Sequence, residues 1–209
     1  MNIFGEPCAG KSLAAAELYA TMGKMGLNVE LVTEYPKDLV WAERHNMFVE
    51  QDYVFAKQNH RLRRLRGKVD FAVTDCPIIM CASYIPEGYP EGLDKFIVNM
   101  FNSYTNVNYF LKRNHPYIGL GRNQNEEEAG EKRIEIRAFL EQHDVHYLDL
   151  DADFAVKFIM HQLLSQPKIA QQPHGLSVLR TPPETRIQKA KRVLGSLINT
   201  ELWRRNSNH

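Results

Sequence analysis

The run of residues best suited to chemistry lies near the start of the chain: Gly5, Glu6, Pro7, Cys8, Ala9, Gly10, Lys11 and Ser12. It fits the pattern G-x-x-x-x-G-K-[ST], in which backbone N–H groups at a helix N-terminus surround phosphate oxygens. Its two glycines permit the backbone angles and the close approach that such a loop needs. We expect Lys11 to neutralise the β- and γ-phosphates of ATP and the Ser12 hydroxyl to ligate Mg²⁺. A glycine-rich turn that only caps a helix is the alternative interpretation.

Strands and helices alternate along the chain around this run. The hydrophobic pattern predicts strands at 28–33, 71–74, 107–111 and 145–150, after an apolar lead at 1–4. It also predicts helices at 12–25, 93–104, 125–141 and 152–164, and a helical region at about 37–66 in one or two pieces. Such alternation is typical of a parallel sheet with helices on both faces. We therefore predict an α/β fold of three layers with about five parallel strands.

Two carboxylates follow predicted strands. Glu34 comes after the strand at 28–33, and Asp75 comes after the strand at 71–74. Ligands of open parallel sheets bind at the carboxyl ends of the strands, so both side chains are expected to face the 5–12 loop. We assign Asp75 to the ligands of Mg²⁺ and Glu34 to the acceptance of a proton from an attacking hydroxyl. Alternatively, either residue caps the helix that follows it.

Three arginines follow the fourth predicted strand. Arg122 lies in a glycine-flanked loop, and Arg133 and Arg137 are spaced to share one helix face. A mobile cover that carries such arginines would stabilise charge on a transferring phosphoryl group and exclude water. We therefore expect Arg122 to be catalytic and Arg133 to bind the nucleotide. In the alternative interpretation, Arg133 and Arg137 pair with acidic neighbours on a solvated helix.

A dense basic run lies at the end of the predicted helix 37–66 and contains Arg61, Arg63, Arg64 and Arg66. Arginines in such a cluster could contact a nucleic-acid backbone. The alternative is a solvated helix face that the helix dipole stabilises.

The end of the chain differs in charge from the rest. Residues 166–209 carry eight Lys or Arg and two acidic residues, so their net charge is +6, whereas residues 1–165 sum to −5. Four prolines within 166–183 indicate a linker, and a basic helix is expected after it. We therefore divide the chain into a core at 1–165 and a basic tail at 166–209. The tail could bind DNA, pack on the core or join protomers into a homo-oligomer.

The overall composition excludes several classes of protein. The net charge of the whole chain is +1, and the 44% hydrophobic fraction is enough for a buried core and excludes wholesale disorder. No apolar run approaches the ~18–20 residues of a membrane-spanning helix, and no secretion signal is visible. Three cysteines without metal-ligand spacing favour a reducing compartment. We therefore expect a cytoplasmic protein.

Several linked stretches resemble a family of phage-encoded P-loop proteins, often labelled AAA-type ATPases or nucleotide kinases: NIFGEPCAGKS, NVELVTEYPKDLVWAERHNM, KQNHRLRRLRGKVDFAVTDCPI, NYFLKRNHPY and GRNQNEEEA. The family is similar to small nucleoside and nucleotide kinases and to kinases of 5-hydroxymethyluracil in phage DNA. The resemblance covers residues 1–165 and implies a five-stranded parallel core in the cytoplasm of a host cell. It also implies that residues 5–12 bind ATP, that Glu34 and Asp75 flank the reacting centre, and that Arg122 belongs to a lid.

The resulting prediction is a kinase that uses ATP and Mg²⁺ to phosphorylate a hydroxyl of a nucleotide-type acceptor, with 5-hydroxymethyluracil in phage DNA as the preferred candidate. One alternative is a kinase of free nucleosides or nucleoside monophosphates, and another is a regulatory P-loop NTPase without a phosphoryl acceptor. Two departures from the family bear on the site. Pro7, Cys8 and Ala9 stand where such loops have smaller, glycine-rich residues, and Pro36 alters the turn after Glu34.

Overall fold

The computed structural model of the chain describes residues 1–114 and 126–165, the side chains of 126–129 excepted. The expectations for Arg122, for a helix start at Asn125 and for the tail at 166–209 lie outside the described residues.

Parallel strands form one five-stranded sheet with the order β2-β3-β1-β4-β5. In chain order these strands are β1 (Asn2–Gly5), β2 (Val29–Val32), β3 (Phe71–Thr74), β4 (Asn108–Lys112) and β5 (Leu148–Asp151). The predicted α/β fold with a parallel sheet is therefore confirmed.

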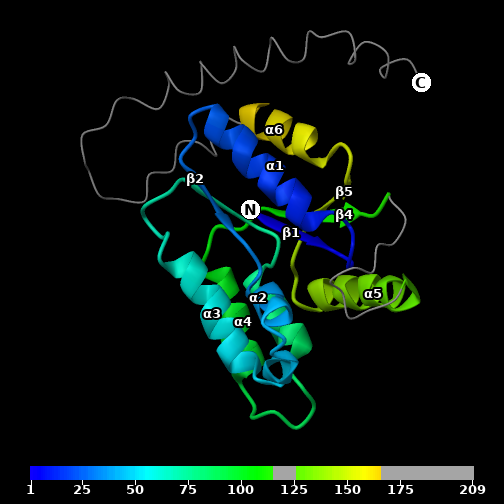
Figure 1. Cartoon of the computed structure of the whole chain (residues 1–209). Helices are drawn as coiled ribbons and strands as arrows, with labels where there is room; N and C mark the ends of the chain where they lie inside the picture. Colours follow the sequence, from blue (N-terminus) through cyan, green and yellow to red (C-terminus); the bar gives the residue numbers. More distant parts are fainter. Residues whose placement is uncertain (115–125, 166–209) are drawn as a thin grey trace.

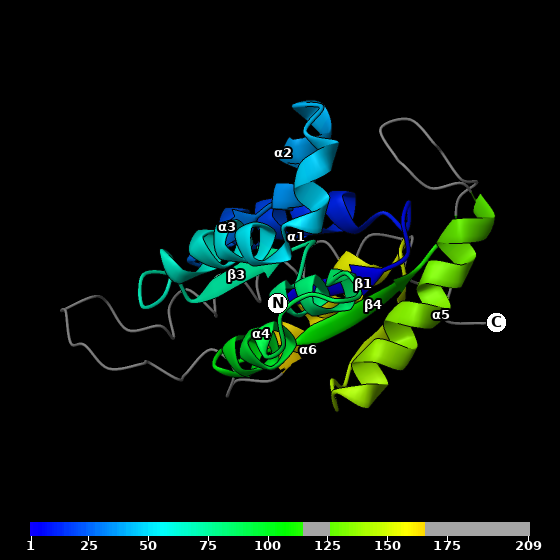
Figure 2. The same cartoon turned by 90° about the horizontal axis from the view of Figure 1, so that it is seen from below.

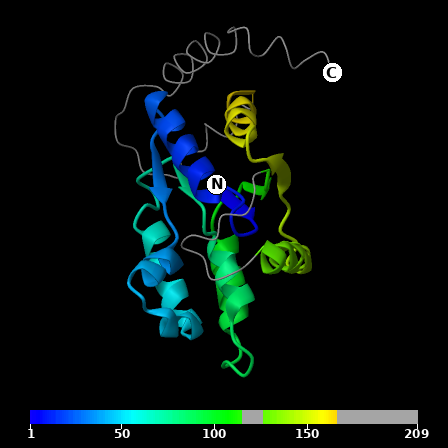
Figure 3. The same ribbon diagram turned by 45° about the vertical axis from the view of Figure 1, so that its right-hand side comes forward.

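Helices cover both faces of the sheet. They are α1 (Lys11–Lys24), α2 (Tyr35–Trp41), α3 (Gln51–Arg63), α4 (Leu93–Asn102), α5 (Glu126–Gln142) and α6 (Ala155–Ser165), with 3₁₀ helices η1 (His45–Val49) and η2 (Ile78–Tyr84). Helices α1 and α6 pack side by side on one face (Figures 1 and 3). Helices α3, α4 and α5 lie on the opposite side, which Figure 2 shows from below. The result is a three-layer arrangement of helix, sheet and helix.

Successive residues of β1 point into different layers of this arrangement. Ile3 packs in one apolar cluster with Leu18 of α1 and Ile159 of α6. Phe4, the next residue, packs in a second cluster with Ile97 and Phe101 of α4. Because side chains alternate along a strand, a short apolar strand such as β1 builds both cores at once.

The region predicted as a helix over 37–66 forms three separate elements. Helix α2 begins at Tyr35, because Pro36 fits the first turn of a helix, where its missing N–H is not needed. Helix α2 ends where the N–H of Arg44 donates to the carbonyl of Leu39 at 2.9 Å and Glu43 takes a left-handed conformation, with φ 54°. The 3₁₀ helix η1 follows, and α3 begins only at Gln51.

The last predicted strand, 145–150, begins later than its apolar pattern indicated. The N–H of Val145 donates to the carbonyl of Leu140 at 2.9 Å, and Asp144 has φ 52°. These features close the end of α5 in a turn. Strand β5 therefore starts at Leu148. No element was predicted over Ile78–Tyr84, where η2 forms.

The strand order creates a switch point at β1. Strand β3 pairs with one edge of β1 and β4 pairs with the other. Strands β2 and β3 therefore lie on one side of β1, and β4 and β5 lie on the other. In sheets of this kind the crevice beyond the carboxyl ends of the strands is where ligands bind. Residues that follow β1, β2 and β3 therefore meet at one edge of the sheet. No helix in the described part of the chain is long and apolar enough to cross a membrane.

Candidate functional site

The loop at 5–12 connects the central strand β1 to helix α1. Gly5 has φ 147°, and a Cβ at this position would lie 3.0 Å from the carbonyl oxygen of Leu111, so only glycine fits without displacement. Gly10 has φ 80° and Cys8 has φ 63°, both in the left-handed region. The N–H of Ala9 donates to the carbonyl of Glu6 at 3.2 Å. The backbone of the loop is therefore tightly folded.

The N-terminus of α1 is open at the end of this loop. Gly10 is the N-cap residue, so no side chain caps the helix, and the first turn contains no acidic residue. The ammonium of Lys11 donates to the carbonyls of Gly5 at 3.0 Å and Glu6 at 2.9 Å. A helix N-terminus with free amides and an adjacent ammonium attracts an anion.

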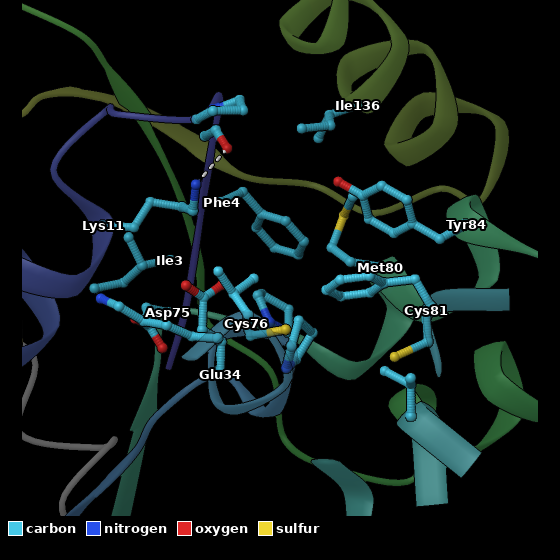
Figure 4. Close-up of a pocket in the computed structure, with 18 of the residues that line it drawn as sticks. Ile3, Phe4, Lys11, Glu34, Asp75, Cys76, Met80, Cys81, Tyr84 and Ile136 are labelled. Atoms are coloured by element: carbon cyan, nitrogen blue, oxygen red, sulfur yellow. Dashed lines mark hydrogen bonds between the residues drawn. The ribbon is translucent and has the colours of Figure 1, made fainter. Parts of the chain in front are cut away.

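A cavity of about 430 Å³ lies beside the loop, at the carboxyl ends of β1, β2 and β3. Figure 4 shows Lys11, Asp75 and Glu34 on one side of it. Its other side is apolar and is formed by side chains from β1, η2 and α5, among them Phe4, Met80, Cys81, Tyr84 and Ile136. The cavity thus has a polar end next to the loop and an apolar end away from it.

Asp75 contributes a buried carboxylate to the polar end. Its side chain belongs to a residue that is only 4% exposed, and its Oδ1 has no hydrogen-bond partner among the described residues. The hydroxyl of Thr74 fixes the backbone after it, because it accepts from the N–H of Cys76 at 3.1 Å and lies 3.2 Å from the Cys76 carbonyl. A buried carboxylate oxygen without a partner suits a cation or a proton donor on a ligand.

The residues of the cavity fit Mg²⁺ only if phosphates and water supply most of its ligands. In the described ranges no three His, Cys, Asp or Glu side chains lie together as a metal site. Mg²⁺ commonly binds to one or two protein oxygens and takes its remaining ligands from phosphates and water. Asp75 supplies one such oxygen on the cavity wall, whereas Ser12, in the first turn of α1, is not among the residues that line the cavity.

Glu34 lines the cavity and does not cap the helix that follows it. It occupies the N-cap position of α2, yet its side chain makes no capping hydrogen bond there. The alternative that Glu34 serves to cap the next helix is therefore wrong. Asp75 does not cap the next helix either, because the N-cap residue of η2 is Pro77.

Gln58, which the sequence did not single out, ties these two carboxylates together through the backbone. Its fully buried amide accepts from the N–H of Tyr35 at 2.8 Å and donates to the carbonyls of Thr33 at 3.3 Å and Cys76 at 3.2 Å. These contacts hold both neighbours of Glu34 and the residue after Asp75. A glutamine within a helix carries no signal in the sequence that could have indicated this role.

Glu6 and Arg113 form a buried ion pair beneath the loop. Glu6 is 2% exposed, and its Oε1 lies 3.9 Å from the Nε of Arg113, which follows β4. This pair brings the end of the fourth strand to the back of the 5–12 loop. Arg113 thus supports the loop, a role that the sequence left unassigned.

Arg133 and Arg137, the two arginines of α5, have different surroundings. Arg133 is exposed and is not on the cavity wall, whose contribution from α5 is Ile136. Arg137 pairs with Asp149, contacts the Tyr147 hydroxyl at 3.1 Å and lies over the Phe110 ring. Arg137 therefore joins α5 to the sheet.

Some arginines of the basic run near the end of α3 make contacts within the protein. Arg61 pairs with Asp38, donates to the Thr33 carbonyl at 3.0 Å and lies over the Tyr35 ring. Arg66 lies over the Tyr104 ring, whereas Arg63 and Arg64 are exposed.

Two thiols on the cavity wall are poor nucleophiles. Burial raises the pKa of Cys81 from 9.0 to about 12. Burial also raises the pKa of Cys76 well above its ordinary value, and the nearby carboxylates of Glu34 and Asp75 add to this shift. Both thiols therefore stay protonated at neutral pH, and the chemistry of the cavity is left to its carboxylates and lysine.

No protein-family model matches the chain, and a search of curated proteins also found no match.

Proposed function

We propose that the protein is a kinase that transfers the γ-phosphoryl group of ATP to a hydroxyl of a nucleotide-type acceptor. The observation that supports this most is the meeting of three groups around one cavity: the ammonium of Lys11, the partnerless Oδ1 of Asp75 and the carboxylate of Glu34. An ammonium beside open helix amides suits the phosphates, and the two carboxylates at the same end of the cavity suit a metal and an acceptor.

In this proposal the loop at 5–12 is a P-loop that holds the phosphates of ATP through its backbone amides. Lys11 exchanges its contacts to the carbonyls of Gly5 and Glu6 for phosphate oxygens. Asp75, with the hydroxyl of Ser12 next to Lys11, would hold Mg²⁺, which would neutralise charge on the phosphates.

Glu34 is the proposed acceptor of the proton. The acceptor hydroxyl forms a new O–P bond to the γ-phosphorus, the bond from the γ-phosphorus to the bridging oxygen breaks, and ADP leaves. The proton of the hydroxyl goes to the Glu34 carboxylate, which is free of a capping role. Positioning of the two substrates supplies most of the rate in reactions of this kind.

The acceptor is proposed to be nucleotide-like because of a second cation on the wall. Lys37 of α2 lines the cavity and makes no ion pair with the described residues. An ammonium in this position suits an acceptor that carries its own phosphate. The preferred candidate remains 5-hydroxymethyluracil in phage DNA, with a free nucleoside or nucleoside monophosphate as the alternative.

Transfer of a labelled phosphoryl group tests this function. The protein is incubated with γ-labelled ATP, Mg²⁺ and a panel of nucleosides, nucleoside monophosphates and DNA that contains 5-hydroxymethyluracil. We expect label on at least one acceptor, and its loss in Glu34→Gln. Hydrolysis of ATP with no label on any acceptor would instead support a regulatory NTPase and refute the kinase.

A further inference from the structure

One of the side chains that line the cavity is an amide that the proposed chemistry does not use. Gln51, the first residue of α3, lines the cavity and is 4% exposed. One N–H of its amide donates to the carbonyl of Phe48 at 2.7 Å, which fixes the direction of the side chain. Its second N–H and its Oε1 have no hydrogen-bond partner among the described residues. A buried amide thus keeps one donor and one acceptor for a ligand.

The wall around this amide is otherwise apolar and partly aromatic. Phe48 of η1, Val54 of α3, and Met80 and Tyr84 of η2 line the same cavity. Figure 4 shows Met80 and Tyr84 at the end away from Lys11. The polar groups that this wall offers are the Gln51 amide and the Tyr84 hydroxyl, which are too few for the several hydroxyl groups of a sugar, and an alkyl chain would leave the amide without a partner. A flat heterocycle with apolar faces and one polar edge satisfies both features.

We infer that the apolar end of the cavity binds the heterocyclic base of the acceptor, and that Gln51 reads the base edge through a paired donor and acceptor. This inference rests on the proposed function, because it names the part of the acceptor that the site recognises. A base held there extends its sugar or its exocyclic hydroxyl toward Glu34 at the polar end. Gln51 is a specificity-determining residue in this account, since unpaired polar groups discriminate strongly against a ligand that lacks their partners.

The test measures binding without ATP, so that it does not depend on phosphoryl transfer. The probes are 5-hydroxymethyl-2′-deoxyuridine monophosphate and the four common deoxynucleoside monophosphates, with 2-deoxyribose 5-phosphate as the probe that lacks a base. Each nucleotide is also tested in a form that is methylated on the ring nitrogen of the pairing edge of its base, N3 of pyrimidines or N1 of purines. Affinities are measured by isothermal titration calorimetry.

We expect at least one nucleotide to bind tighter than the sugar phosphate, and edge methylation to weaken that nucleotide about tenfold or more. Gln51→Leu should bind the methylated and unmethylated forms equally, whereas the control Gln142→Leu, at the exposed end of α5, should keep the preference. Because the methylated probes act on the unchanged protein, the test does not depend on the folding of the variant.

Two outcomes would overturn the inference: no base binds better than the sugar phosphate, or Gln51→Leu keeps the full preference for the unmethylated edge. Failure of the proposed function gives a different result, in which edge-dependent binding is found but no acceptor becomes labelled. Transfer to methylated and unmethylated acceptors at equal rates would leave the kinase intact and refute the role of Gln51.

Discussion

The amide of Gln58 donates a hydrogen bond of 3.2 Å to the backbone carbonyl of Cys76, and this bond joins the segments that follow β2 and β3. The same amide holds the backbone on both sides of Glu34. The spacing between the two candidate carboxylates, Glu34 and Asp75, is therefore set by a residue that is not on the cavity wall. Gln58 is a positioning residue in the proposed reaction.

Replacement of Gln58 should separate positioning from stability. Gln58→Met removes three hydrogen bonds and leaves the N–H of Tyr35 without its glutamine partner, whereas the Thr33 carbonyl keeps Arg61 and the Cys76 carbonyl keeps the Thr74 hydroxyl. The free energy of unfolding should therefore fall by about 2 kcal/mol. A misplacement of about 1 Å at Glu34 should also reduce the rate of transfer on the order of 100-fold.

The matched control is Gln162→Met in α6, because within residues 1–114 and 126–165 that amide has one hydrogen bond, which it accepts from the Tyr109 hydroxyl at 3.0 Å on the other face of the sheet. Urea unfolding and transfer assays of both variants compare the effects. Equal rates per folded molecule in the two variants would remove the positioning role of Gln58.

The left-handed conformation of Cys8 gives a second prediction. Cys8→Gly removes a steric cost of about 1–2 kcal/mol and adds an entropic cost of about 0.5–1 kcal/mol. Its free energy of unfolding should therefore change by less than about 1 kcal/mol. Cys8→Val, with a branched Cβ at φ 63°, should lose about 2 kcal/mol. Chemical denaturation measures both, and a valine variant as stable as the parent would contradict the loop geometry.

The ion pair of Glu6 and Arg113 predicts a compensating pair of substitutions. Arg113→Met removes the guanidinium from a carboxylate that is 2% exposed and should cost about 3 kcal/mol. Addition of Glu6→Gln removes the buried charge and should recover part of that loss. A double-mutant cycle from thermal or urea unfolding measures the coupling. Additive effects would show that the two side chains do not depend on each other.

Alkaline pH should weaken the fold through buried thiols and phenols, among them Cys81 and Tyr109. Burial raises the pKa of Cys81 from 9.0 to about 12 and that of Tyr109 from 10.0 to about 12. The folded state thus binds protons that the unfolded state releases, so this stability is complete below pH 9 and is lost as the pH rises to 12. Between pH 8 and 10.5, Cys81 alone should account for a fall of about 2 kcal/mol.

The comparison that checks this is the fall in unfolding free energy between those two pH values for the parent and for Cys81→Ala. The variant should show a fall smaller by about 2 kcal/mol. An identical fall in both proteins would mean that the Cys81 thiol does not contribute.

Much of the fold was predictable because its signals are local. Alternating apolar stretches indicated strands β1 to β4 to within one residue at most ends, and glycine at position 26 marked the end of the first helix. The boundaries that were missed depend on contacts between segments. The start of β5 is delayed because Val145, an apolar residue suited to a strand, bonds to Leu140 and closes α5. No property of Val145 itself carries that information.

The residues of the candidate site also fall into those that the sequence indicated and those that it did not. The pattern at 5–12 and the strand ends at Glu34 and Asp75 were readable in the sequence, because a parallel sheet gathers such residues at one edge. Gln58 and Gln51 were not, since a glutamine within a helix indicates nothing until its neighbours across the fold are known. The apolar end of the cavity is likewise built from η1, η2 and α5, which meet only in three dimensions.

The proposed binding of Mg·ATP by the loop at 5–12 is the central claim, and isothermal titration of the protein with ATP and Mg²⁺ tests it most directly. Lys11→Ala removes the ammonium at the loop, whereas Lys24→Ala removes an exposed one at the far end of the same helix. The account predicts binding by the parent and by Lys24→Ala, and binding about 100-fold weaker in Lys11→Ala. No binding by the parent, or equal affinity in all three proteins, would contradict it.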